Sequence, residues 1–330
     1  MIDHVPAPGE HASGVDLLRV VAIALIVNSH LDDFYPLPAL ATGGAIGNAL
    51  FFALSGFGLA ASARRTRPGF AAWFRRRICR IYPALLLSVA GFIALPGRAW
   101  ASWSLSEWAA QMIWPTDYWF IGALMLFYLL LYPLILIARP GVYLGLMAAL
   151  LIPYLTWYLT ALDLTRYTIE GVGHFKWIHY FQVMLFGAYL SGRKELLAAG
   201  GGWLDAALLT AAIAGYHGLL LVIGSGGVGW LQGFTHLLVY PMILLALRLA
   251  CSPPAADRLL ELPGVRVAVP FVAGITLELY LVQGPVRAIR WVYAAPFPLN
   301  IVICLSMTLA AAYLLHRAAA TVSRLVRCAP

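Results

Sequence analysis

The sequence predicts an all-α integral membrane protein, a single bundle of about ten transmembrane helices. Of its 330 residues, 62% are hydrophobic and only 11% are charged, and the mean hydropathy is +0.82. A soluble domain carries about 25% charged residues, so this chain has too little charge to cover a water-exposed surface. We therefore expect one transmembrane domain over residues 1–330 and no soluble extracytoplasmic domain.

Ten apolar runs are each long enough to cross the hydrocarbon layer, which takes about 20 helical residues. The predicted helices span 15–31, 44–62, 78–96, 117–138, 141–161, 176–192, 203–223, 228–250, 267–290 and 297–317. Between the third and the fourth, the stretch Trp100–Trp114 is rich in Trp and contains Glu107, a composition typical of a segment that lies in the interface. The first 14 residues lack the basic start of a cleaved signal peptide, so we expect a short cytoplasmic tail there.

The distribution of positive charge predicts that both termini lie in the cytoplasm. With that orientation, most of the 22 Lys and Arg residues fall in cytoplasmic connections or in the tail 318–330, and the largest group runs from Arg64 to Arg80. The longest outer connection, 162–175, is only mildly polar. The net charge of +8 is thus explained by the inner membrane surface, and we do not expect nucleic-acid binding.

The cysteines do not indicate a metal site or a disulfide framework. The four of them, Cys79, Cys251, Cys304 and Cys328, show no paired spacing. No zinc site is expected, and no other metal ligand set stands out.

Arg19 and His30 belong to the first predicted helix, where an ionisable side chain is costly and therefore a functional candidate. Their separation is close to three helical turns, which would place both on one face, about 16 Å apart along the axis. Arg19 would lie near the cytoplasmic mouth, and His30 deep or toward the outer face. The alternative is that Arg19 snorkels to lipid headgroups and that His30 is a hydrogen-bonded residue at a helix end.

Arg77 and Arg80 lead directly into the third predicted helix, three residues apart and so on one face. Their guanidinium groups would suit a phosphate-rich ligand that arrives from the cytoplasm. For the preceding run from Arg64 to Arg76 we prefer a simple positive-inside anchor.

The ninth predicted helix carries Glu278 and Gln283. A carboxyl group at mid-membrane must be protonated, paired or hydrated. Arg19 or an arginine of the third helix would be a sensible partner for Glu278. In the second helix, the small residues from Gly43 to Gly58 predict close helix packing. Ser55 lies among them and could donate to a ligand, although its surroundings do not match a nucleophile elbow.

In their order along nearly the whole chain, these segments resemble the membrane-bound acyltransferase 3 family, the O-acetylases of bacterial surface glycans. The matching pieces are Asp16-Leu17-Leu18-Arg19 with His30, then Phe51-Phe52-Ala53-Leu54-Ser55-Gly56-Phe57, then Arg77-Ile78-Cys79-Arg80-Ile81-Tyr82-Pro83, and Trp119-Phe120-Ile121-Gly122 with Phe127–Pro133. Three positions depart from the family pattern. Ala49 stands where an acid is common, Leu124-Met125-Leu126 replaces an E-E-Q, and Gln283 replaces a second His. These departures leave His30 as the only obvious titratable catalyst.

The resemblance implies an O-acyltransferase of the bacterial cytoplasmic (inner) membrane. It would take an acyl group, by default acetyl, from cytoplasmic acyl-CoA and pass it to a hydroxyl of a glycan or another exported or lipid-linked acceptor. His30 would act as the general base and Asp33 would orient it. Arg19, Arg77, Arg80 and Ser55 would hold the donor, acetyl-CoA, and the substrate would contact Glu278, Gln283 and Trp119.

Beyond the bilayer, the donor and the acceptor, a homo-oligomer is a further partner that the sequence leaves open. The competing function is a transporter or flippase of a polar metabolite or glycan precursor, because buried Arg, His and Glu would also suit a polar pathway. Its expected signs are pseudo-repeated halves and broken helices, and the sequence shows neither.

Overall fold

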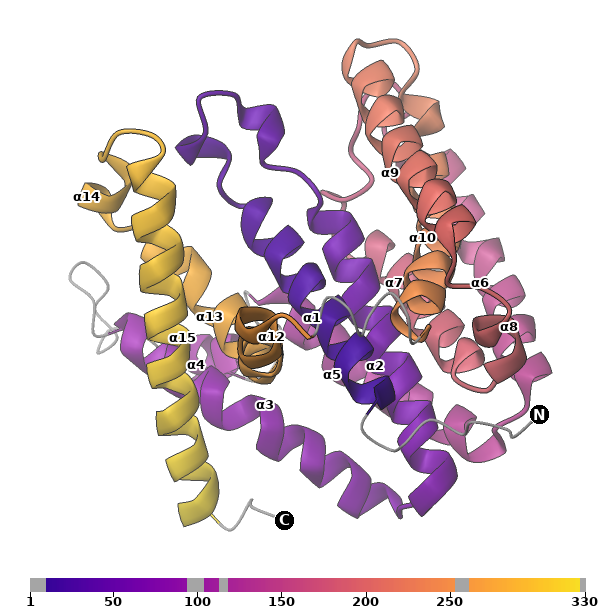
Figure 1. Ribbon diagram of the computed structural model, residues 1–330, viewed down its shortest axis with the longest axis horizontal. Coiled ribbons are helices and arrows are strands. Elements are labelled where there is room, and N and C mark those ends of the chain that lie inside the picture. The colour runs from indigo at the N-terminus through magenta and orange to yellow at the C-terminus, as the bar shows by residue number, and fades with distance from the viewer. Residues whose placement is uncertain (1–9, 94–103, 113–117, 253–260, 327–330) are drawn as a thin grey trace. The chain divides into compact units, whose positions relative to one another are not determined.

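A computed structural model describes residues 10–93, 104–112, 118–252 and 261–326 of the chain. These residues form helices and connecting loops, and no strand is present among them (Figure 1). The helices are α1 (Glu10–Asn28), α2 (Gly44–Thr66), α3 (Phe70–Ile93), α4 (Leu105–Met112), α5 (Trp119–Ile137), α6 (Pro140–Ala161), α7 (Phe175–Leu190), α8 (Lys194–Ala198), α9 (Trp203–Gly224), α10 (Gly233–Ala250), α12 (Pro263–Gly274), α13 (Thr276–Arg287), α14 (Arg290–Tyr293) and α15 (Leu299–Leu325). Short 3-10 helices are η1 (Asp32–Phe34), η2 (Pro38–Leu40) and η4 (Gly229–Gln232).

Each of the ten apolar runs predicted from the sequence contains a helix where it is described, but the first run ends at Asn28 and not at residue 31, and another run is not a single helix. The run 267–290 consists of α12 and α13, which a break at Ile275 separates. Hydropathy averages over such a break, so the sequence pattern did not reveal it. The predicted interfacial stretch contains the short helix α4, and much of the rest of that stretch lies outside the described residues.

Among the described residues, six helices are long and apolar enough to cross a membrane, or up to seven if the bent pair α12 and α13 counts as one span. The six are α2 with the segment before it, α5, α6, α9, α10 with η4, and α15. Three other predicted spans are not among these six. The helix α7 has only 16 residues, and the helices α1 and α3 carry several charges. The chain is therefore an all-helical protein with multiple membrane spans, and a count of ten and cytoplasmic termini stay predictions.

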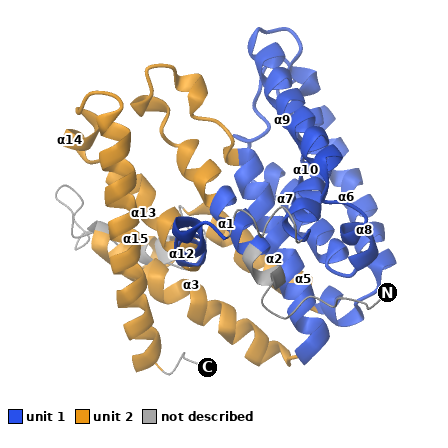
Figure 2. Ribbon diagram, in the orientation of Figure 1, with its two compact units in different colours: residues 1–22, 45–67, 133–273 blue, residues 23–44, 68–132, 274–330 orange. Residues whose placement is uncertain are grey.

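The chain divides into two compact units, each assembled from separate stretches (Figure 2). Unit 1 comprises residues 1–22, 45–67 and 133–273, and unit 2 comprises 23–44, 68–132 and 274–330. The boundary passes through α1 between Ala22 and Ile23.

In unit 1, helices α2 and α7 approach so closely that two glycines are required where they meet. A Cβ atom on Gly56 would overlap the carbonyl oxygen of Met184, and a Cβ atom on Gly187 would overlap that of Ala53. The small-residue segment of α2 thus serves helix packing, as the sequence predicts. Helices α6 and α7 also pack together, as do α9 and α10.

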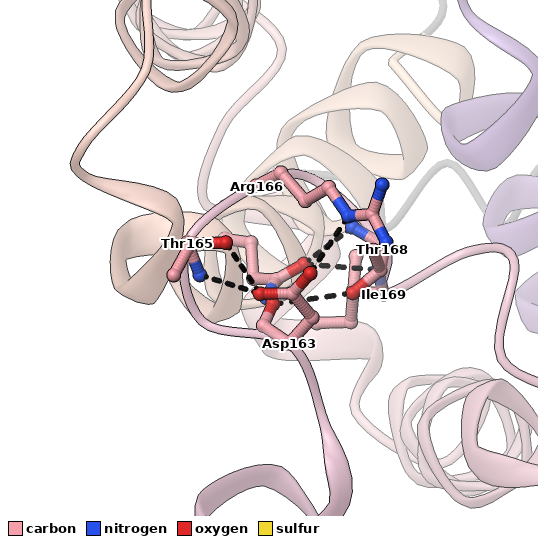
Figure 3. Close-up of polar contacts among 6 residues, drawn as sticks. Asp163, Thr165, Arg166, Thr168 and Ile169 are labelled. Carbon is pink, nitrogen blue, oxygen red and sulfur yellow. Dashed lines mark hydrogen bonds and ion pairs between the residues drawn. The ribbon is translucent and has the colours of Figure 1, made fainter.

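The connection between α6 and α7 in unit 1 is a compact polar loop built around Asp163 (Figure 3). Its carboxylate accepts hydrogen bonds from the backbone and hydroxyl of Thr165, at 2.9 and 2.6 Å, and from Arg166 Nε at 2.7 Å. The buried amide of Gln232 fastens the loop, because its Oε1 accepts from the backbone N–H groups of Thr168 and Ile169. The polar side chains of Asp163, Thr165 and Arg166 therefore bind one another within the loop.

In unit 2, helices α3, α13 and α15 pack against one another. A cluster of buried residues joins the segment after α1 to the end of α13, to α14 and to α15. Its members are Leu31, Phe34, Val286, Val292 and Cys304. This packing, together with the hydrogen bond from Asn300 Nδ2 to the Phe34 carbonyl, fixes the segment that follows His30.

The spacing of the cysteines does not indicate a disulfide framework, but the structure has a disulfide bond at Cys79. Cys251 and Cys304 are free thiols. Spacing along the chain did not reveal the bond, because a disulfide depends on the distance between two cysteines in space.

Candidate active site

His30 lies in a turn directly after α1, two residues beyond the last residue of that helix. The backbone N–H of His30 donates to the carbonyl of Val27 at 3.1 Å, so the turn continues the end of the helix in a tighter form. The side chain of Asn28 folds the following loop back, because its Nδ2 donates to the carbonyls of Leu40 and Thr42 at 2.9 and 3.0 Å. His30 is thus presented, exposed, on a fixed turn of unit 2.

This position removes the basis for placing Arg19 and His30 on one helix face. Helical periodicity ends with α1 at Asn28, before it reaches His30. Arg19 belongs to unit 1, where its guanidinium forms an ion pair with Asp16 at 2.6 Å. Both residues of the predicted D-x-x-R piece therefore bind each other, and His30 belongs to unit 2.

Arg287 and Asp32 are the two charged groups that shift the pKa of His30. Arg287, the last residue of α13, donates from Nη1 to the backbone carbonyl of His30 at 2.5 Å and lies 3.4 Å from Asp32 Oδ1. The pKa of His30 is lowered from 6.5, first because its ring is partly desolvated although the residue is exposed, and second because Arg287 is positive. Asp32 opposes this shift in part.

Asp33, the residue predicted to orient His30, is exposed. Among the described residues, no hydrogen bond joins its carboxylate to the imidazole. Asp32 is the carboxylate that affects His30 electrostatically. The role of Asp33 stays a prediction, which the structure does not support with a contact.

Glu278 is the centre of a buried ion-pair group in unit 2. Its carboxylate is fully buried, and Oε1 lies 3.0 Å from Arg80 Nη1 and 2.9 Å from His316 Nδ1. The sequence predicts an arginine of the third predicted helix as a partner of Glu278, and Arg80 of α3 is that arginine. His316 of α15 was not predicted, because a polar residue is common at the end of an apolar run and does not indicate a buried contact.

Arg80 also stabilises the break between α12 and α13. Its Nη2 donates to the carbonyl of Gly274 at 2.8 Å, one of the carbonyls that the end of α12 leaves without a helical partner. One guanidinium group therefore binds a helix end and a buried carboxylate. Arg77 differs, because it lies over the ring of Trp73, 4.6 Å from the centroid, and makes no ion pair among the described residues.

Two acceptor atoms on α13 are buried without a partner in the described structure. They are Glu278 Oε2 and Gln283 Oε1. A buried polar atom left unpaired costs about 1–3 kcal/mol, so these acceptors call for water or a ligand with donor groups. The buried hydroxyl of Ser88 on α3 is also unpaired. All three belong to the helices that surround the Arg80–Glu278 pair.

The remaining predicted site residues are Trp119 and Ser55. Trp119 begins α5 in unit 2, where the neighbouring Phe120 packs against Tyr280 of α13 with ring centroids 5.3 Å apart. Trp119 thus lies next to the helix that carries Glu278 and Gln283. Ser55 is partly buried in α2 of unit 1. Unit 2 therefore holds His30, Asp33, Arg77, Arg80, Trp119, Glu278 and Gln283, and unit 1 holds Arg19 and Ser55.

Sequence reasoning also missed a buried polar network in unit 1. The ring of His236 on α10 lies between the Tyr154 hydroxyl, 3.0 Å from Nδ1, and Glu170 Oε1, 2.9 Å from Nε2. The ring of His179 stacks on it with centroids 3.7 Å apart. The sequence offered one signal of this network, which is a histidine inside a predicted membrane helix. His179 lies in the sixth predicted helix and His236 in the eighth. This network ties the 162–175 loop to α6, α7 and α10.

The helices and these side chains define an integral membrane protein whose polar groups gather at a histidine and at a buried ion pair. A family described as an acyltransferase domain matches residues 13–317, so the chain belongs to the acyltransferase 3 family and is a membrane acyltransferase. Neither a curated protein nor a solved structure matches the chain. No group of three or more His, Cys, Asp or Glu residues in the described part is arranged to hold a metal ion.

Proposed function

We propose that this acyltransferase moves an acyl group, by default acetyl, from cytoplasmic acyl-CoA to a hydroxyl of a glycan or another exported or lipid-linked acceptor in a bacterial inner membrane. The observation that carries the proposal is His30, a histidine with a lowered pKa, held on a fixed turn beside Arg287. A neutral imidazole at working pH accepts the proton of an attacking hydroxyl.

In the proposed reaction the acceptor oxygen attacks the carbonyl carbon of the thioester while His30 takes the hydroxyl proton. The C–S bond then breaks, the new ester leaves, and the thiolate of CoA takes the proton from the imidazolium. In an acyl-histidine relay, the ring nitrogen would attack the thioester and the C–S bond would break to release the thiolate of CoA. The acceptor hydroxyl would then attack the acyl group, the C–N bond would break, and the departing imidazole would take the hydroxyl proton and pass it to the thiolate. Both routes require His30, and neither requires another titratable group.

The charges of unit 2 support a path for the donor. In the predicted orientation, Arg77 and Arg80 lie toward the cytoplasm, where they would meet the phosphates of CoA. Along α13, Gln283 follows Glu278 by about 7.5 Å and Arg287 follows by about 13.5 Å, at 1.5 Å per residue. The unpaired acceptors on Glu278 and Gln283 suit donors on the substrate, either the amide N–H groups of the CoA arm or acceptor hydroxyls.

Replacing Arg77 by alanine should raise the apparent KM for acyl-CoA about tenfold with a smaller change in kcat, because a charge-assisted hydrogen bond to phosphate contributes about 1.5–3 kcal/mol. The measurement is the rate of label transfer at varied concentrations of labelled acetyl-CoA. Arg76, exposed one position earlier, is the matched control, and Arg76→Ala should leave KM near the wild-type value. An unchanged donor dependence in Arg77→Ala would contradict a role in donor binding.

One observation favours the competing transport function. Broken helices with polar residues at the break are typical of secondary transporters, and α12 and α13 form such a pair next to Arg80 and Glu278. Membranes that contain the protein, incubated with labelled acetyl-CoA, separate the two functions. Label in a glycan or lipid-linked fraction is the result expected of an acyltransferase, and its absence together with uptake of a polar precursor would favour transport.

A further inference from the structure

Arg287 contacts the segment around His30, although the two residues lie far apart in the sequence. The two residues come from opposite ends of the chain, and the guanidinium of Arg287 donates to the carbonyl of His30 itself. The same nitrogen lies 3.4 Å from the carboxylate of Asp32, two residues further on. A single cation therefore bridges the backbone and the first acidic side chain of this turn.

The hydrophobic cluster of unit 2 makes this contact a stable one. Val286, adjacent to Arg287, packs with Leu31, adjacent to His30. Phe34 packs in the same cluster. Because buried apolar contacts fix the residue next to His30 and the residue next to Arg287, the guanidinium is held at a defined place on the turn that carries the imidazole.

The geometry points to Arg287 as the residue that positions His30 and keeps its imidazole in the neutral, proton-accepting form. This inference rests on the proposed role of His30 as the general base. Arg287 acts through His30 and is therefore a positioning residue. It does so in two separable ways, by a directed hydrogen bond to the His30 carbonyl and by the positive charge that disfavours an imidazolium beside it.

The charge effect has a definite sign. A positive neighbour lowers the pKa of a histidine, so the ring stays neutral to lower pH. Removing the charge of Arg287 raises the pKa, and more of the base is then protonated at a given pH. In and next to the cluster that holds this turn, the titratable groups are Arg287 at the end of α13, Asp32 and Asp33 of η1, Tyr35 directly after it, Arg290 and Tyr293 of α14, and Cys304 of α15.

The test is a titration of His30 by NMR in the full chain labelled at histidine and held in lipid nanodiscs, with His30→Gln to identify its signal. Arg287→Gln should raise the pKa of His30 by roughly half a unit to one unit, since a nearby charge shifts a pKa by about one unit or more and solvent reduces the effect at an exposed site. Arg290→Gln removes the same charge three residues away and should shift the signal far less. Equal shifts in the two variants, or none in Arg287→Gln, would overturn the electrostatic part.

Arg287→Lys tests the hydrogen bond, because lysine keeps the charge but lacks the planar fork. The pKa of His30 should stay near the wild-type value while kcat for acyl transfer falls roughly tenfold. Full activity in Arg287→Lys would overturn the positioning role. Since the titration needs no turnover, it reports on Arg287 even if His30→Ala proves active and the proposed base is wrong.

Discussion

Replacing His30 by alanine should reduce acyl transfer by about 10²–10⁴-fold, the usual contribution of a general base. The residue is exposed, and its fixed contact is made by its backbone carbonyl, which alanine retains. The variant should therefore insert and fold like the wild type. The measurement is the initial rate of label transfer from labelled acetyl-CoA, with equal amounts of protein in matched membranes.

His174 provides the control for this variant. It is also exposed and lies in unit 1, so His174→Ala should keep nearly full activity. Near wild-type transfer by His30→Ala would show that the base lies elsewhere. Loss of transfer in both variants would show that removing any exposed histidine impairs the protein, and the assignment of His30 would then fail.

Replacing Arg80 by methionine should destabilise the protein by about 2–3 kcal/mol. Removing one partner of a buried ion pair typically costs about 3–5 kcal/mol, because the other charge is left buried. The lower value is expected here since the Arg80 side chain is half exposed, 49%, although that of Glu278 is fully buried. The carbonyl of Gly274 loses its donor as well. The measurement is the midpoint of thermal unfolding in one detergent.

The double variant Arg80→Met with Glu278→Leu separates the ion pair from simple loss of packing. Without the carboxylate there is no unpaired buried charge, so part of the lost stability should return. An Arg80→Met protein as stable as the wild type would contradict the pairing seen in unit 2. Strictly additive losses in the double variant would show that the two side chains do not interact.

Much of the helical architecture follows from hydropathy, whereas the details of the site do not. The ten apolar runs predict where helices form, because a long apolar run in lipid must satisfy its backbone internally. The break at Ile275 escaped prediction because apolar residues predominate on both sides of it, so the average hydropathy stays high. A window of average hydropathy cannot distinguish one bent pair from one straight helix.

A contact of the site was predictable only where the free-energy cost of a buried charge indicates that a residue of opposite charge lies beside it. The carboxyl group of Glu278 had to be protonated, paired or hydrated, and the sequence named an arginine of the third predicted helix as a possible partner, which Arg80 is. Arg287 was not predicted because an arginine at the end of a membrane helix is already explained by the interface. His30 and Arg287 are 257 residues apart, and only the packing of α13 against the turn after α1 reveals that they meet.

The alternation of the two units along the chain constrains the order in which the protein is assembled. Unit 2 needs residues 274–330 to provide Glu278, Arg287 and α15, so it is completed only after these residues have been synthesised. Until then Arg80 has no carboxylate partner, and the turn that carries His30 has no anchor. During biosynthesis the emerging chain would therefore be inactive until α13 and α15 are inserted. Co-expression of the chain as two fragments, divided within 253–260, should restore activity only when both halves meet in the membrane.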